Sequence, residues 1–232
     1  MIKTGLIWTA AGLLVMLAAA FWAMPQLPAD GIPTHWGFNG EPDRLSSREE
    51  ATAILFLMPA VTVLLAAMLA VAPMLDPFQA GLRHSAKAYL AGWIGAVVLM
   101  TFCAVGLALM MVGGQAGPSG DTFPRIVLSG AALMIIVLGN YLPKTRQSFF
   151  LGVRTPWTLT SAIAWERTHR LAGLLFVLAG LFGLFAALFL DGLWAILPFS
   201  FAMMAVALIC IVYSYFAWRS APDKIDGADY IV

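Results

Sequence analysis

Long apolar runs alternate with short polar stretches along the whole chain. Six runs contain no Asp, Glu, Lys, Arg or His, and they cover residues 5–24, 52–74, 89–112, 126–142, 171–190 and 193–218. A helix of about 20 apolar residues crosses a bilayer. The first run is longer than the apolar core of a cleaved signal peptide, so we interpret it as a retained anchor. The pattern predicts an all-α integral membrane protein with six transmembrane helices.

Small residues recur at intervals of four in two of these runs. Ala88, Gly92 and Ala96 share one face of the third predicted helix, and Ala179, Gly183 and Ala187 share one face of the fifth. Such faces let helix backbones approach closely within a membrane. We therefore expect tight helix contacts there, although Ala and Gly are also simply common in membrane helices.

The polar stretches divide the basic residues unequally between the two sides. If the N-terminus is cytoplasmic, the outer side receives three basic residues, Arg44, Arg48 and Arg125. The inner side receives the other ten, which are Lys3, Arg83, Lys87, Lys144, Arg146, Arg154, Arg167, Arg170, Arg219 and Lys224. Because cytoplasmic loops carry an excess of Lys and Arg, we expect both termini to be cytoplasmic and the protein to lie in the plasma membrane.

Composition narrows the class of protein further. Apolar residues make up 61% of the 232 residues and charged residues 11%, against about 25% charged in an ordinary soluble domain. The net charge of +1 lacks the basic surplus of a nucleic-acid binder, so no direct nucleic-acid contact is expected. Both cysteines, Cys103 and Cys210, lie in apolar runs, and the sequence predicts no metal site and no cofactor. The oligomeric state stays open.

The first outer loop, residues 25–51, carries a concentrated set of polar and aromatic residues. Asn39-Gly40 is a strong turn signal and predicts a short hairpin, while Ser46 or Ser47 ahead of two glutamates predicts a helix cap. The candidate contact residues of this loop are His35, Trp36, Asn39, Glu41, Asp43 and Arg44. His35 beside Asp43 or Glu41 is compatible with metal binding or acid–base chemistry. Anchoring of the loop among lipid headgroups explains the same residues.

The long inner loop, residues 143–170, is the richest polar segment. Thr160 or Ser161 is predicted to cap a helix that continues into the fifth span, which places Trp165 and His169 on one face of that helix. Three basic side chains of the loop, Lys144, Arg146 and Arg154, are expected to reach lipid phosphates or loop carbonyls.

Motifs in both loops carry a family resemblance. Residues 140–170 include N-Y-L-P-K-T-R, F-L-G-V-R-T-P-W-T-L and W-E-R-T-H-R, and they resemble the signature of the SdpI-like family of membrane immunity proteins. The outer run I-P-T-H-W-G-F-N-G-E-P-D-R resembles a small domain of unknown function that often precedes it. The resemblance implies an N-terminal helical hairpin with an ordered outer loop (residues 1–75) and an SdpI-like four-helix region (residues 76–232).

The resemblance also implies a function. It implies a non-enzymatic membrane protein that protects against or senses a secreted antimicrobial peptide and signals by holding a cytoplasmic transcriptional repressor. The inner partner-binding residues that it implies are Asn140, Lys144, Arg146, Arg154, Thr155, Pro156, Trp157, Trp165, Thr168 and His169. Family members often place acidic residues just before the tryptophan, whereas residues 161–164 here read S-A-I-A.

Two other functions are compatible with the residues. A transporter or channel that exports a peptide or lipid would suit six spans, although ion-coupled carriers usually place ionisable groups inside the bundle and these spans have none. A membrane hydrolase acting through His35, Asp43 and Glu41 is also conceivable, although no HExxH or GxSxG motif is present.

Overall fold

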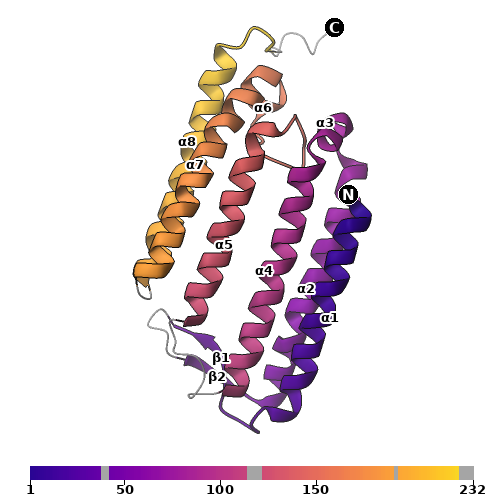
Figure 1. Cartoon of the computed structure of the whole chain (residues 1–232), viewed down its shortest axis with the longest axis vertical. Helices are drawn as coiled ribbons and strands as arrows, with labels where there is room; N and C mark the ends of the chain where they lie inside the picture. Colours follow the sequence, from indigo (N-terminus) through magenta and orange to yellow (C-terminus); the bar gives the residue numbers. More distant parts are fainter. Residues whose placement is uncertain (38–41, 114–121, 191–192, 225–232) are drawn as a thin grey trace.

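Six long helices make up most of the computed structural model, which describes residues 1–37, 42–113, 122–190 and 193–224 (Figure 1). They are α1 (Ile2–Ala23), α2 (Arg48–Leu75), α4 (Ala86–Gly113), α5 (Thr122–Tyr141), α7 (Ala162–Phe189) and α8 (Leu193–Arg219). Within the described ranges, six helices are long and apolar enough to cross a membrane, which confirms the six predicted spans.

The helices turn apolar side chains outward. Leu14, Leu64 and Phe189, on three different helices, are 70%, 62% and 68% exposed. A water-soluble protein rarely exposes continuous apolar surface on this scale. The outward faces therefore suit contact with lipid chains.

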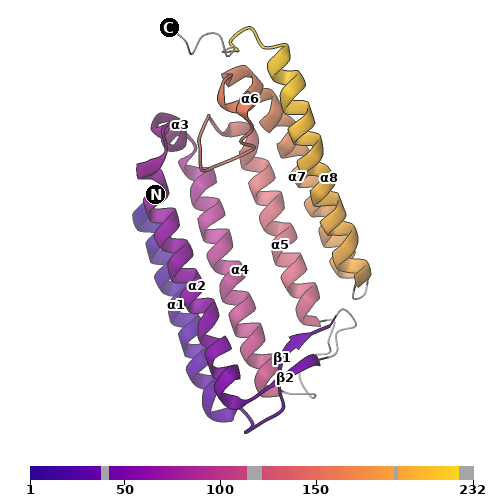
Figure 2. The ribbon, with the colours of Figure 1, turned by 180° about the vertical axis from the view of Figure 1, so that it is seen from behind.

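The helices form two groups of three that meet along one seam (Figures 1 and 2). Helices α1, α2 and α4 pack on one another, α7 packs on both α5 and α8, and α4 contacts α5 at the seam. Helix α4 therefore packs with the helices of residues 1–75, although it belongs to the predicted region 76–232. That division into two regions stays a prediction.

The two ends of the bundle differ in what caps them. One end, called here the connector end, holds α3 (Gln79–His84), η3 (Leu142–Lys144) and α6 (Pro156–Leu159). The start of α1 and the end of α8 also lie there (Figure 1). The opposite end, the hairpin end, holds β1 (Ile32–Trp36) and β2 (Pro42–Ser46). Which end faces the cytoplasm stays a prediction.

Close backbone contact joins α5 and α7. A Cβ on Gly173 would lie 2.7 Å from the Gly139 carbonyl oxygen, and a Cβ on Gly139 would lie 2.9 Å from the Gly173 carbonyl oxygen. Further along α7, Ala179, Gly183 and Ala187 are all buried. The tight contact predicted for the fifth span is therefore present, and small residues at these positions permit it.

Helices α1 and α4 are joined by a satisfied polar contact. The Trp93 indole is fully buried, and its Nε1–H donates to Thr9 Oγ1 at 3.0 Å. The Thr9 hydroxyl donates in turn to the Gly5 carbonyl at 2.9 Å. The Trp93 N–H and the Thr9 hydroxyl each have a hydrogen-bond partner. Burial therefore does not leave the indole N–H unpaired, which would be costly.

A two-stranded hairpin departs from the all-α prediction. Strands β1 and β2 are antiparallel, and Ile32 pairs with Ser46 while His35 pairs with Arg44. The buried side chains of Leu27 and Ile32 pack with residues of α1, α2 and α4, which seats the hairpin on the first helix group. This hairpin was predicted from its Asn39-Gly40 turn, which itself lies outside the described residues. A short η1 turn (Met24–Gln26) links α1 to it.

Candidate functional site

The hairpin end displays an exposed imidazole–carboxylate pair. His35 Nδ1 lies 2.6 Å from Asp43 Oδ1, and the two side chains are 68% and 52% exposed. Because a carboxylate only accepts, the imidazole donates its Nδ1–H to Asp43. Arg44 is exposed on the neighbouring strand position. The hairpin therefore presents both signs of charge within a small area.

The other predicted outer residues are only partly described. Trp36 is the last residue of β1, and Asn39 and Glu41 lie outside the described residues. His84 and His169 belong to α3 and α7 at the connector end. Among the described residues, no three His, Cys, Asp or Glu side chains are grouped closely enough to hold a metal ion.

An acidic cleft lies beside the hairpin, where the loop enters α2. It has a volume of about 680 Å³, and its lining includes Asp30, Arg48 and Glu49. The Arg48 guanidinium donates to the Met24 carbonyl at 2.9 Å, so part of its hydrogen-bonding capacity is already used. Ser47 caps α2 by accepting from the Glu50 amide at 3.3 Å, as predicted. This cap turns the first two glutamates of α2 toward the surface.

At the connector end, the segment between α5 and α7 (residues 142–161, the connecting segment) folds back over the helix ends. Thr155 and Thr158 form a capping box at α6. The Thr155 hydroxyl also lies 3.0 Å from Ser214 Oγ of α8, and the Trp157 ring packs edge-on to Tyr215 with centroids 5.4 Å apart. The segment is therefore fastened to α8.

His169 fastens the same segment to α7. Its ring stacks on Trp165 with centroids 4.0 Å apart. The Val153 amide donates to His169 Nε2 at 2.9 Å, and Nδ1 lies 2.8 Å from the Trp165 carbonyl. Because Nε2 accepts, the proton of the neutral ring is on Nδ1. Gly152 has a φ of +96°, and a Cβ there would collide with the His169 ring.

A buried carboxylate joins the two helix groups at this end. Asp76, which follows α2, is 1% exposed. Its Oδ2 accepts from the Ser148 hydroxyl at 2.7 Å, its Oδ1 accepts from the Phe78 amide at 2.7 Å, and the Phe149 amide lies 3.1–3.2 Å from both oxygens. Within the described ranges no basic side chain pairs with it. Three neutral donors therefore hold this carboxylate. The Phe78 amide is close in sequence, and the Ser148 hydroxyl and the Phe149 amide come from the connecting segment.

Two further contacts reinforce this junction. The Arg146 amide donates to Ser85 Oγ at 2.9 Å, and a Cβ on Gly81 would collide with the Gln147 carbonyl. Residues 76–85 of the first helix group and residues 145–149 of the connecting segment thus contact each other along their backbones. We call this set of contacts the junction.

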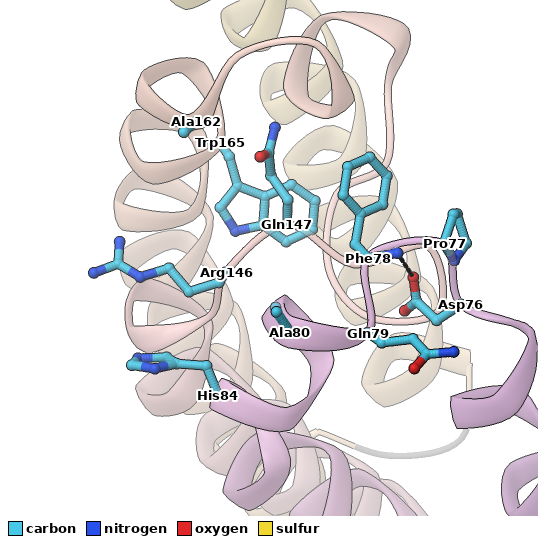
Figure 3. A pocket seen from close by; sticks show the side chains of 11 residues that line it. Asp76, Pro77, Phe78, Gln79, Ala80, His84, Arg146, Gln147, Ala162 and Trp165 are labelled. Atoms are coloured by element: carbon cyan, nitrogen blue, oxygen red, sulfur yellow. Dashed lines mark hydrogen bonds between the residues drawn. The ribbon is translucent and has the colours of Figure 1, made fainter.

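A cleft of about 780 Å³ opens beside the junction (Figure 3). Asp76, Phe78 and Gln79 line it from one side, and Arg146, Gln147 and Trp165 line it from the other. The Trp165 indole donates to the Thr145 carbonyl at 3.2 Å, and Gln147 donates to the Thr158 carbonyl at 3.0 Å. The cleft therefore spans the two helix groups, and changes at the junction alter its walls.

The predicted inner residues divide by burial. The exposed ones are Asn140, Lys144, Arg146, Arg154 and Pro156, and Trp157 is half-buried. The buried ones are Thr155, Trp165, Thr168 and His169. The side chains of these four pack inside the structure, and their partner-binding role stays a prediction. The partner-binding role of the exposed residues stays a prediction.

The exposed charges have local partners. Arg154 donates to the Phe149 carbonyl at 2.9 Å, one of the two predicted kinds of contact. Glu166 lies 2.7 Å from Arg170 and 3.9 Å from Arg146. Both pairs are solvent-exposed and contribute little to stability.

An acidic residue from beyond α8 lies at the start of α7. Ser161 caps α7, its hydroxyl donates to Asp223 Oδ1 at 2.6 Å, and the Ile163 amide donates to Asp223 Oδ2 at 3.1 Å. Burial alone raises the pKa of the Asp223 carboxyl, but these hydrogen bonds outweigh it and hold that pKa below its ordinary value. A carboxylate therefore stands at the helix start although S-A-I-A precedes Trp165.

Sequence reasoning missed three of these residues. Asp76, Ser85 and Asp223 were not candidates, although Asp76-Pro77 directly after an apolar run is a turn signal of the kind that buries a capping carboxylate. No local signal identifies their distant partners.

Two family models match this chain. Residues 144–214 match the SdpI/YfhL protein family, and residues 11–63 match a domain of unknown function (DUF1648). The first match runs through the connecting segment, α7 and most of α8. The second runs from α1 through the hairpin into α2. These matches confirm the resemblance identified from the sequence.

A curated relative matches part of the chain. The immunity protein SdpI of Bacillus subtilis (strain 168) is 29% identical over 103 residues, which is 44% of this chain and 47% of that protein. The chain therefore spans about half the length of the curated relative it matches. No solved structure matches.

Proposed function

We propose that this chain is a membrane immunity protein that protects its cell against a secreted toxic peptide. The similarity to the immunity protein SdpI carries this proposal, together with the match of residues 144–214 to its family. In this chain the matched residues build the connecting segment and the helices that hold it. The resembling part is thus an ordered element of the fold.

The peptide meets the hairpin end, which in this proposal faces outward. The ten basic residues assigned to the cytoplasmic side support this orientation. The hairpin end offers Asp30 and Glu49 in one cleft and the His35–Asp43 pair nearby. Carboxylates that face solvent attract a cationic peptide and raise its rate of association.

When the peptide binds, the affinity of the connector end for a cytoplasmic transcriptional repressor changes. Such a response requires two states of the protein that bind the partner differently. The junction is suited to this role because it is the place where the two helix groups share a buried carboxylate. Arg146 and Trp165 beside it line a cleft large enough for a protein segment.

Protection is tested by expressing the chain in a peptide-sensitive bacterium and measuring growth against a panel of secreted antimicrobial peptides. We expect the inhibitory concentration of at least one cationic peptide to rise. The double variant Asp30→Asn/Glu49→Gln should lose most of that protection, whereas Glu50→Gln, an exposed neighbour that does not line the cleft, should keep it. Unchanged sensitivity to every peptide at normal membrane levels of the protein would refute the proposal.

Repressor binding is tested separately, by crosslinking in intact cells with and without the protective peptide and identifying the captured protein by mass. Arg146→Gln should reduce peptide-dependent capture of a DNA-binding protein, and Arg219→Gln at the same end should not. If the same protein is captured equally with and without the peptide, the signalling part of the proposal is contradicted. The immunity part is then unaffected.

A further inference from the structure

A second pocket at the connector end takes no part in the proposed function. It has a volume of about 560 Å³ and lies where the start of α1, the end of α2 and α3 meet. Two basic residues from distant parts of the sequence, Lys3 and Arg83, line it together with Gln79. The other lining residues have apolar side chains, and they are Met1, Ile2, Pro73, Met74 and Leu82.

The described residues do not supply a counter-charge for this pocket. Among the residues that the structure describes, no carboxylate lines the pocket, and no ion pair involves Lys3 or Arg83. The carboxylate nearest in sequence, Asp76, is buried with its oxygens bound by Ser148, Phe78 and Phe149. Lys3 and Arg83 therefore line one cavity in which the described part of the chain places no carboxylate.

The pocket lies at the end of α2, beside exposed apolar side chains. Met74 in its wall is 69% exposed and its neighbour Leu75 is 66% exposed, so the end of α2 presents apolar surface beside the two cations. Leu82 is buried and seats α3 against the bundle, which fixes Arg83 one residue further along. An occupant must carry negative charge and an apolar portion side by side.

We propose that this pocket binds the headgroup of one anionic phospholipid. The phosphodiester would accept from the Arg83 fork and the Lys3 ammonium, and the Gln79 amide could donate to a phosphate or glycerol oxygen. The acyl chains would lie against Met74 and Leu75. Basic pockets between membrane helices on the cytoplasmic side are suited to anionic lipid headgroups. The proposal depends on the helices lying in a membrane and is independent of peptide immunity.

Native mass spectrometry of the purified full chain tests the site. The protein in detergent is titrated with phosphatidylglycerol or with zwitterionic phosphatidylcholine, and bound lipid is counted. We expect one phosphatidylglycerol to bind more tightly than phosphatidylcholine. Each of Lys3→Gln and Arg83→Gln should weaken it about fivefold, and the double variant about 25-fold.

Matched controls separate this site from general attraction to a basic surface. Lys87→Gln removes an exposed cation of the same end that does not line the pocket, and it should leave binding unchanged. Equal binding of the two lipids, or an equal loss in Lys87→Gln, would overturn the proposal. Displacement of phosphatidylglycerol by millimolar inorganic phosphate alone would also overturn it, because the pocket would then be a site for free anions.

Discussion

At the hairpin end, His35 and Asp43 contact each other on the surface, and more than half of each side chain is exposed. At the connector end, Asp76 and His169 are buried and accept hydrogen bonds from backbone amides of distant segments. The same residue types therefore serve opposite purposes. Polar groups that face solvent remain available to a partner, whereas buried polar groups are costly to leave unpaired and fix the fold around them.

The comparison also assigns different tasks to the two matched regions. The hairpin sits on the first helix group through a few apolar side chains and leaves its charged side chains exposed to solvent. The connecting segment is fastened to α7, α8 and the residues that follow α2. Substitutions at the hairpin end should alter recognition at constant stability, and substitutions at the connector end should alter stability first.

The glycines with positive φ give the largest expected contrast. Gly152→Ala places an alanine on a backbone with positive φ, which strains it, and the added methyl group collides with the His169 ring. We therefore expect the free energy of unfolding to fall by about 3–4 kcal/mol. Gly31→Ala at the hairpin end has a φ of +72° with nothing within 4 Å of the added Cβ. It should lose only the backbone cost of about 1 kcal/mol.

Unfolding in mixed micelles, followed by circular dichroism, measures both glycine variants. Similar losses for the two would mean that the His169 ring moves aside easily. The connecting segment would then be no more rigid than the hairpin.

A matched pair of aspartates is expected to differ next most. Asp76→Ala leaves the Ser148 hydroxyl and two backbone amides without their acceptor, which should cost about 2–3 kcal/mol. Asp43→Ala removes an exposed partner of His35 and should cost less than about 1 kcal/mol.

The same unfolding assay compares the aspartate variants, and Asp76→Asn serves as the intermediate case because it keeps one acceptor oxygen. If Asp76→Ala is as stable as the unsubstituted protein, the junction does not hold the helix groups together.

The sequence predicts the local features of both ends better than the long-range contacts of the connector end. Helix spans, the hairpin turn and the caps at Ser47 and Ser161 follow from local patterns that need no tertiary contact. Asp76 and Ser148 are separated by 72 positions in the chain, and each taken alone resembles an ordinary loop residue. The pairing depends on how α4 and α5 pack, which local patterns do not specify.

Burial is a second property that local patterns do not specify. Trp165 and His169 lie on one face of α7, as their spacing predicts, and both side chains are buried against the connecting segment. The motif R-T-P-W-T carries both exposed and buried members, because Thr155 caps α6 while Arg154 points outward. A motif shared within a family marks positions that matter without separating folding from binding.

The two histidines should differ more modestly. His169→Phe keeps an aromatic ring for stacking on Trp165 but leaves the Val153 amide and the Trp165 carbonyl without this partner. We expect a loss of about 1–2 kcal/mol. His35→Phe should leave stability nearly unchanged and, under the proposed function, reduce protection against the peptide.

Thermal unfolding and the growth assay together test the histidine variants. If His35→Phe lowers stability as much as His169→Phe, the hairpin is a folding element rather than a recognition element. If His169→Phe abolishes protection at full stability, the buried histidine takes part in signalling.

The smallest effect concerns Asp223 and depends on pH. Its pKa is lowered in the folded protein by Ser161 and Ile163 against the opposing effect of burial, so its contribution to stability is complete above the ordinary value of 3.8. That contribution is lost as the pH falls through the lower folded pKa. The stability difference between the unsubstituted protein and Asp223→Asn should therefore be small at pH 7 and vanish in acid. A stability difference that stays the same from pH 7 into acid would mean that Ser161 and Ile163 do not hold the Asp223 carboxylate in the folded protein.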